Sequence, residues 1–276
     1  YFDLYKKIPE FTEQNYLMTL DEFKVIFWWE FIHRFLGRLI GIFFILPLIY
    51  FSIKLGFNKS KNLFLIFFLI CLQGFVGWYM VSSGLVDRVD VSHYRLSLHL
   101  ITAFVILSIV FWKFLELTDL KTNQISIKLS YIKFFLFLIY VQLIIGAFVS
   151  GMDAGRIYNT WPLMGTTYFP DDNTYKNLIN ISVFNDPSLV QFIHRNLAYL
   201  ILLYYILIVI KIYKKNLFYF FTITKVIGVL LLIQIVLGVF TLLSGAQMLL
   251  SSMHQISSIF LVSSIIYFLY SNSETN

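Results

Sequence analysis

The chain is poor in charged residues, because only 13% of its 276 residues are Asp, Glu, Lys or Arg. A soluble protein of this length carries roughly a quarter. Hydrophobic residues make up 59%, and several apolar runs reach the ~20 residues that a helix needs to span a bilayer. A membrane β-barrel would instead show short segments of alternating polarity. The composition therefore predicts an all-α polytopic membrane protein.

Cysteine is nearly absent. The one cysteine, Cys71, lies inside an apolar run, which excludes an intramolecular disulfide and a thiolate metal cluster. The net charge of +6 does not indicate nucleic-acid binding, because the lysines gather in short segments between apolar runs, where they set membrane orientation. We therefore expect membrane lipid around the chain and no nucleic-acid partner.

Seven apolar runs are long enough to be membrane-spanning helices. They cover residues 25–53, 63–86, 95–114, 131–151, 189–211, 218–243 and 248–270. The connections 54–62, 113–133 and 211–225 are rich in lysine, and the positive-inside rule places them in the cytoplasm. Residues 1–24, expected to be an aqueous loop with short helical pieces, and the connection 152–188 then lie on the outer side.

An internal repeat relates two parts of the chain at an offset of 161 residues. Residues 31–40 read FIHRFLGRLI and residues 192–201 read FIHRNLAYLI, so seven of ten positions are identical. Ionisable residues within a membrane-length segment are costly and usually mark a functional site. The repeat therefore indicates a duplicated site.

The repeat includes a Gln-x-x-x-Gly spacing in three spans. It occurs at Gln73 and Gly77, at Gln142 and Gly146, and at Gln234 and Gly238. The span 131–151, shifted back by 161, falls before residue 1, so the second half has four helices where the first shows three. We therefore predict two pseudosymmetric four-helix bundle halves, residues 1–130 and 131–276, with seven of the eight transmembrane helices present in this chain.

Four of the five histidines form two repeat-related pairs. His33 and His194 share the FIHR sequence, and His99 and His254 lie in the corresponding later span of each half. Two imidazoles that face each other inside a helix bundle are the usual way to hold a b-type haem. Zinc or copper would favour cysteine or carboxylate ligands nearby, and apart from Glu30 these are absent. The pattern favours haem ligation over histidines that only join helices.

Other ionisable residues accompany the histidines of the FIHR sequence. Each of these two histidines is followed by an arginine, Arg34 or Arg195, whose guanidinium is a candidate bidentate partner for a haem propionate. Glu30 lies three residues before the first of these histidines, on the same helix face, whereas the repeat-equivalent residue is Gln191. An acid in one half alone predicts chemistry in the N-terminal half and a bound cofactor in the C-terminal half. His93 has no repeat partner, and we expect it to be structural.

Two other classes of protein share these features. A di-haem membrane cytochrome that only transfers electrons would use the same four histidines, but it would not need an acid in one half alone. A transporter built on a repeat would place polar residues along a path and would bind no haem. The pigment bound to the protein distinguishes the three classes.

Several long segments resemble one known family. They are EFKVIFWWEFIHRFLGRLIG (22–41), GWYMVSSGL (77–85), VSHYRLSLHL (91–100), GAFVSGMDAGRIYNTWPLM (146–164), FIHR (192–195) and MHQ (253–255). Taken in order over nearly the whole chain, they are similar to haem A synthases of the type shared by mitochondria and α-proteobacteria. The paired cysteines that some bacterial members carry in an outer loop are absent from this chain.

The resemblance implies oxidation of a methyl group of haem O to a formyl group, which gives haem A for cytochrome c oxidase. It implies haem b as the cofactor with His194 and His254 as axial ligands, and substrate haem at His33 and His99 with Glu30 as an essential acid. It also implies location in the cell inner membrane or mitochondrial inner membrane. Candidate partners are an electron-transfer protein, haem O synthase (protohaem farnesyltransferase) and cytochrome oxidase assembly factors.

Overall fold

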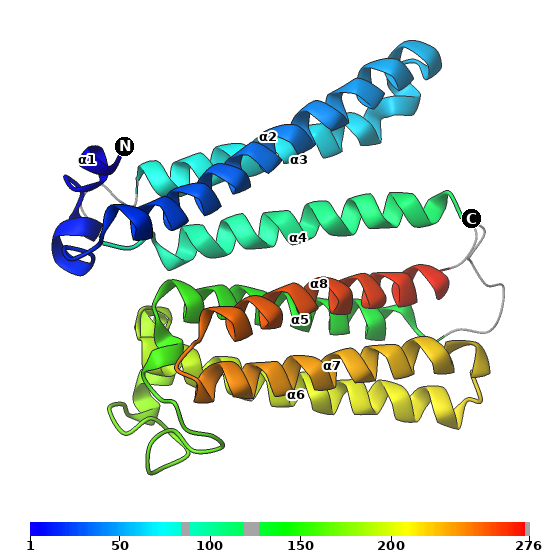
Figure 1. The fold of residues 1–276 in the computed structure, drawn as a ribbon. Coiled ribbons are helices and arrows are strands. Elements are labelled where there is room, and N and C mark those ends of the chain that lie inside the picture. Colours follow the sequence, from blue (N-terminus) through cyan, green and yellow to red (C-terminus); the bar gives the residue numbers. More distant parts are fainter. Residues whose placement is uncertain (84–88, 119–126, 274–276) are drawn as a thin grey trace. The chain divides into compact units, whose positions relative to one another are not determined.

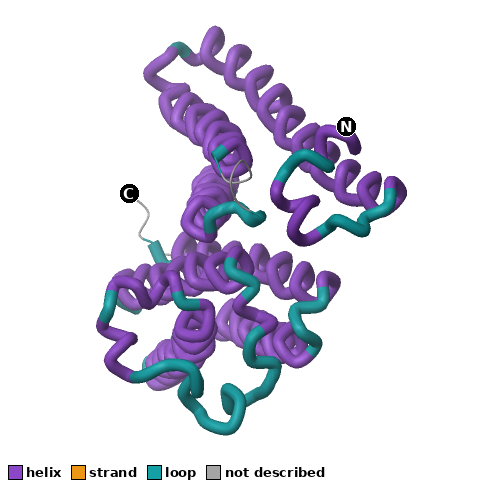
Figure 2. Tube along the Cα trace, turned by 90° about the vertical axis from the view of Figure 1, so that its left-hand side faces the viewer, coloured by secondary structure: helices purple, strands orange, loops and turns teal. Residues whose placement is uncertain are grey.

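The computed structural model is predominantly helical in the part of the chain that it describes, which comprises residues 1–83, 89–118 and 127–273. In these ranges seven helices are long and apolar enough to cross a membrane, and the one extended feature is an isolated bridge between Met164 and Thr167. This confirms the predicted all-α polytopic membrane protein. Figure 2 shows that helices dominate the chain. The predicted connection 113–133 and the end of the predicted span 63–86 lie partly outside the described residues.

The chain forms two compact units, Tyr1–Ile106 and Leu107–Asn276. The elements of the first unit are α1 (Phe2–Tyr5), the π-helical turn η1 (Glu10–Gln14), α2 (Leu20–Leu55), α3 (Phe57–Ser82) and the first part of α4 (His93–Glu116). In this unit α2 and α3 pack against each other along their length (Figure 1). The short helical pieces predicted within residues 1–24 are confirmed as α1 and η1.

Local sequence signals set the two ends of α2. At its start the Thr19 side chain accepts a hydrogen bond from the Glu22 backbone N–H, and the Glu22 carboxylate accepts one from the Thr19 backbone, which forms a capping box. At its end Gly56 adopts φ +78°, which only glycine adopts at little cost, and the chain reverses there. The predicted connection 54–62 is therefore wrong in length, because a single residue separates α2 from α3.

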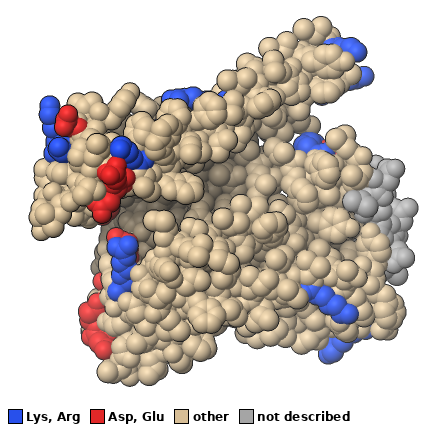
Figure 3. All heavy atoms as spheres, in the orientation of Figure 1, with Lys and Arg blue, Asp and Glu red and all other residues tan. Residues whose placement is uncertain are grey.

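The second unit contains a closed four-helix bundle. Its long helices are α5 (Leu129–Gly151), α6 (Pro187–Lys214), α7 (Phe221–Leu243) and α8 (Met248–Ser271). Helix α5 packs against α6 and α8, and α7 packs against α8 and α6 (Figure 1). Fully buried apolar side chains fill the core, among them Ile132, Val190, Ile212, Val262 and Ile265. In Figure 3 the sides of this unit are uncharged, and its visible charged side chains lie mostly near the helix ends.

A reciprocal pair of hydrogen bonds joins the start of α5 to the end of α8. The Asn272 side chain, just beyond α8, donates to the Ile127 carbonyl at 2.9 Å and accepts from the Ile127 N–H at 3.1 Å. Both residues are buried. The pair satisfies the backbone of Ile127, which precedes α5 and has no helical partner there.

Turn residues fix the other end of the bundle. Helix α6 begins at Pro187, and the Asp186 side chain caps it by accepting a hydrogen bond from the Leu189 N–H at 3.0 Å. Helices α7 and α8 are joined through Gly245 at φ +69° and Ala246 at φ +61°, which lie between the predicted spans 218–243 and 248–270. The connection 152–186 spans the same end of the bundle, and we call this end the loop end.

Candidate active site

The histidines of the second unit lie in one layer near the loop end. His194 is about two turns after the start of α6, and His254 is about two turns after the start of α8. Gly146 in α5 and Gly238 in α7 lie about one and a half turns before the loop end of their helices. Because neighbouring helices in the bundle are antiparallel, these four residues share a level.

Each of these histidines rests on a glycine of the preceding helix. A Cβ built on Gly146 would lie 3.1 Å from Cε1 of His194, and one built on Gly238 would lie 3.1 Å from Cε1 of His254. Both distances are shorter than ordinary van der Waals contact. The imidazoles therefore occupy the space that a side chain at either glycine would need.

A glutamine one turn before the glycine binds the same histidine. Gln142 Nε2 donates to the His194 carbonyl at 3.0 Å and lies 3.3 Å from His194 Nε2. Gln234 Nε2 donates to the His254 carbonyl at 3.1 Å and to Ser257 Oγ at 2.7 Å. We call each combination of glutamine, glycine and histidine a histidine seat.

The first unit has a seat of the same geometry. Gln73 Nε2 donates to the His99 carbonyl at 3.0 Å and lies 3.3 Å from His99 Nε2, while a Cβ on Gly77 would lie 2.8 Å from His99 Cε1. The ring of His33 faces that of His99 at a centroid separation of 6.4 Å. The structure therefore brings together the first predicted histidine pair and places His99 in the same setting as His194.

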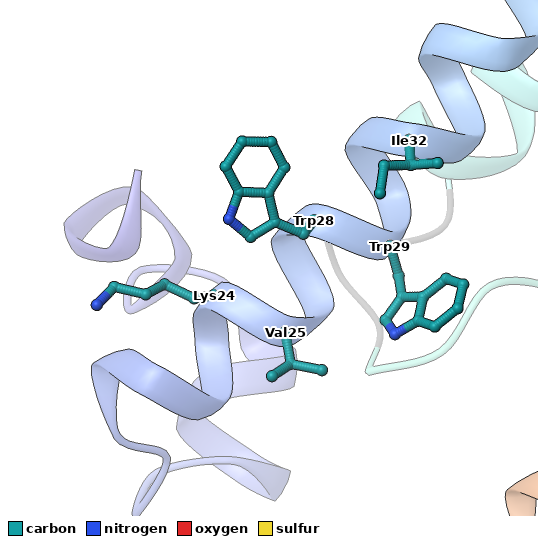
Figure 4. Close-up of a pocket in the computed structure, with 5 residues that line it drawn as sticks. All are labelled: Lys24, Val25, Trp28, Trp29 and Ile32. Carbon is teal, nitrogen blue, oxygen red and sulfur yellow. The ribbon is translucent and has the colours of Figure 1, made fainter.

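Glu30 lies one turn before His33 and forms an ion pair with Arg34. The distance from Arg34 Nη2 to Glu30 Oε2 is 3.2 Å, and the side chains are 51% and 56% exposed respectively. Figure 4 shows the turns just before, where Trp28 and Trp29 point to opposite sides of α2 beside a surface hollow. Exposed tryptophans typically mark the membrane–water interface. Glu30 therefore lies near the level expected for the membrane–water interface.

The repeat-equivalent residues of the second unit have a different role. Arg195 donates to three backbone carbonyl groups of the connection 152–186, those of Tyr158 at 2.9 Å, Thr160 at 2.9 Å and Leu163 at 3.2 Å. Gln191, which is buried, donates to the Tyr158 carbonyl at 3.2 Å. These two side chains hold the connection against α6, a function that the sequence did not indicate.

Further polar contacts fix this connection over the bundle. The Asn159 side chain donates to the Leu242 carbonyl of α7 at 2.7 Å, and Trp161 Nε1 donates to Tyr199 Oη of α6 at 3.0 Å. Asp172 accepts from Ser188 Oγ at 2.6 Å and from Tyr158 Oη at 3.1 Å. Burial raises the pKa of Asp172, but the hydrogen bonds from Ser188, Asn173 and Tyr158 outweigh this and hold it below its usual value.

The residues present fit haem better than a bare metal ion. Among the described residues, no group of three or more His, Cys, Asp or Glu side chains could hold a metal. Two imidazoles on one iron, each with a metal–nitrogen bond of about 2 Å, would place their ring centres about 6 Å apart, which matches the 6.4 Å between His33 and His99. In the second unit Nδ1 of both His194 and His254 is buried without a hydrogen-bond partner.

These features define a polytopic helical membrane protein with histidine pairs in a repeated setting. Residues 1–266 match the model of the COX15-CtaA family, described as cytochrome oxidase assembly protein, and the chain belongs to this family. It is 47% identical over 275 residues to heme A synthase from Pelagibacter ubique, covering 99% of this chain and 81% of that protein. It is 43% identical over 274 residues to heme A synthase from Rickettsia bellii, covering 96% and 81%, respectively.

Proposed function

We propose that this protein is a haem A synthase, which oxidises a methyl group of haem O to a formyl group and so supplies haem A to cytochrome c oxidase. The family match and the relatives support this reaction. The observation that carries it is the difference between two copies of one sequence: Glu30 precedes the first FIHR, and the neutral Gln191 precedes the second. The enzyme therefore belongs to the oxidoreductases.

The cofactor in this proposal is haem b, held by His194 and His254 in the half formed by residues 131–276. When bound, haem supplies the redox chemistry, and the protein supplies orientation and polarity. The contributions of the chain are two imidazoles on glycines of neighbouring helices and a connection tied over the loop end by Arg195. Such a cover limits access of water to the level of the histidines.

The substrate site in this proposal is the half formed by residues 1–130, with haem O bound at His33 and His99. With water as the source of oxygen, conversion of a methyl group to a formyl group releases protons and electrons from one carbon, the electrons pass to an electron-transfer partner, and a nearby carboxylate can serve as the base. Glu30 is the acid one turn from His33, and its half-exposed ion pair with Arg34 provides a route for the proton to water. The same carboxylate stabilises positive charge that develops near the oxidised carbon.

The two arginines are not equivalent as propionate partners. Arg34 is half exposed and bound to one carboxylate, so it remains the better candidate to meet a propionate of haem O. Arg195 uses both terminal nitrogens on backbone carbonyl groups. A propionate there would have to replace these bonds, so Arg195 acts first on the connection and only through it on haem b.

The proposed location is the inner membrane of the cell or mitochondrion, with the histidines toward its outer side and the lysine-rich ends in the cytoplasm or matrix. The reaction removes electrons from the substrate, so the enzyme needs an electron-transfer partner. Haem O synthase, which makes the substrate, and cytochrome oxidase assembly factors, which receive the product, are the other proposed partners.

The decisive test is pigment analysis of the full-length protein together with a reduced-minus-oxidised spectrum. Haem B with haem O or haem A in the extract supports the proposed enzyme. Haem B alone, in protein made by cells that contain haem O, would indicate an electron-transferring di-haem cytochrome. A protein without haem absorption would favour a transporter and overturn the proposal.

A further inference from the structure

Three histidine seats of one design recur in the described residues, on α3 and α4, α5 and α6, and α7 and α8. In each, a glutamine amide reaches across to the backbone carbonyl of the histidine, at 3.0, 3.0 and 3.1 Å. The glycine four residues later lies against Cε1 of the imidazole in all three. A threefold recurrence of the same pair of contacts is not expected from general helix packing.

The bond to the histidine carbonyl determines which end of each amide faces the histidine. A carbonyl oxygen only accepts hydrogen bonds, so the amide NH₂ group must point toward it. In the seats of His99 and His194 this same nitrogen lies 3.3 Å from the imidazole Nε2. Since the NH₂ group only donates, Nε2 is the ring nitrogen that carries the lone pair, and the proton is on Nδ1.

The glycine fixes how the ring lies. Because Cε1 lies between the two ring nitrogens, contact of Cε1 with the helix backbone at Gly77 or Gly146 restricts rotation of the imidazole. The glutamine fixes the height of the histidine relative to that glycine, because its bond spans the two helices. The two residues therefore control the position and the orientation of one nitrogen lone pair.

The seat of His254 differs in one contact. Its Gln234 amide binds the His254 carbonyl and Ser257 Oγ, and the second N–H is thereby used on a hydroxyl instead of Nε2. At the position equivalent to Ser257 the His194 seat has Leu197, which cannot accept a hydrogen bond. The chain thus offers a natural comparison between a seat that contacts Nε2 and one that does not.

We propose that the Gln-x-x-x-Gly pairs are the positioning elements of the haem-binding histidines: glutamine sets the height of each histidine, and glycine sets the plane of its ring. The proposal rests on the proposed function, since it concerns the same haem sites. The glutamines and glycines are positioning residues and not catalytic ones, because they act through the imidazoles.

The test compares two glycines in the same helix, α7. Gly238→Ala places a methyl group against His254, whereas Gly228→Ala places one against Tyr205, far from any histidine. In the full-length protein purified with its haem, Gly238→Ala should shift the low-spin electron paramagnetic resonance signal and the reduced α-band of haem b. Gly228→Ala should lower the melting temperature and leave both spectra unchanged. Spectra that move equally in the two variants, or in neither, would overturn the proposal.

Two substitutions of glutamine extend the test if the alanine variants fold poorly. Gln142→Met keeps the length of the side chain but removes both contacts to His194, and Gln234→Met removes the carbonyl contact of His254 without an Nε2 contact to lose. Both should reduce retained haem b roughly threefold to tenfold, because each variant loses the bond to the carbonyl group that sets the height of its histidine. Wild-type haem content and spectra in both variants would contradict the positioning role.

The histidine variants separate failure of this inference from failure of the proposed function. If His194→Ala and His254→Ala retain haem b, the haem site itself is wrong. If they lose haem b while the glycine and glutamine variants match the wild type in spectrum and content, the site stands and only the positioning role is refuted.

Discussion

Helices α2 and α6 carry the same histidine–arginine turn but use it differently. In α6, Gln191 and Arg195 are bound to the connection 152–186. In α2, the equivalent Glu30 and Arg34 bind each other at 3.2 Å and remain half exposed. One copy therefore uses its polar groups for structure, whereas the other retains a half-exposed acid.

This difference shows that a charge at the position of Glu30 is not needed to build the helix. Gln191 occupies the same position in a helix that is well packed and capped. A group that is ionisable in only one of two equivalent positions is better explained by chemistry than by folding. The following experiments test this division of labour, beginning with the largest expected effect.

The largest effect is expected from the histidines of the second unit. His194→Ala or His254→Ala should remove haem b from the full-length protein, because either change leaves a single axial ligand in the bundle. The measurement is the ratio of haem B to protein after purification. His93→Ala is the control and should retain normal haem content, since Gln73 and Gly77 contact His99 and not His93. Normal haem B in both histidine variants would refute the assignment of the cofactor to this unit.

Glu30→Gln should make the first copy resemble the second. The fold and the haem b spectrum should persist, while haem A formation should fall by roughly 10²–10⁴-fold, the usual effect of removing a general acid or base. Haem extracted from cells that carry the variant as their only copy should contain haem O or the alcohol intermediate in place of haem A. Normal haem A would show that Glu30 is only an interfacial residue, and joint loss of haem b would show that it is structural.

Gln191→Glu is the reverse exchange and should affect stability instead of activity. The new carboxylate is one turn from Arg195, so it should form the ion pair seen in α2 and draw Arg195 away from the carbonyl groups of the connection 152–186. Because Gln191 is buried and donates to the Tyr158 carbonyl, we expect a loss of about 1–3 kcal/mol. Thermal unfolding should show the change, with haem A formation per folded protein unaltered. Reduced conversion by a fully stable variant would contradict the comparison.

The smallest effect concerns pH and the connection 152–186. The pKa of Asp172 is lowered from 3.8 by its hydrogen bonds, so its contribution to stability is fully present above about pH 5 and is lost as the pH falls through the lowered pKa. Asp172→Asn should therefore be less stable than the wild type at neutral pH, and the difference should shrink below about pH 4. Limited proteolysis of the connection 152–186 across this pH range measures the difference in stability between the variant and the wild type. A difference that does not depend on pH would show that the carboxylate charge is not involved.

The apolar runs were sufficient to predict the seven helices, because membrane spans are set by length and composition. The identical FIHR sequences likewise predicted that the histidines occupy related helices. The single-residue turn at Gly56 could not be predicted, because the polar residues around it resemble an ordinary loop. The contacts of Arg195 to three backbone carbonyl groups depend on how a distant segment folds back, which no local pattern encodes.

The three glutamines recur at a fixed spacing in the sequence, but that spacing did not predict their contacts with the histidines. The recurrence of Gln-x-x-x-Gly was visible, yet a glycine in a membrane helix usually indicates close approach of another helix. Only the structure shows that an imidazole approaches each of these glycines and that the amide one turn earlier holds the same residue. A repeat of polar and small residues opposite a repeat of histidines is therefore a pattern that can be sought in sequences.

The buried pair between Ile127 and Asn272 has a consequence for synthesis of the protein. Helix α5 enters the membrane early in the making of the second unit, but the partner of Ile127, which precedes α5, lies beyond the last helix of the unit. The Ile127 backbone therefore stays unpaired until translation of the unit is almost complete, and the ring of four helices closes last. A chain that ends before residue 272 would lack both hydrogen bonds to Ile127, so α8 would not be joined to the start of α5 at the end of the bundle opposite the histidines.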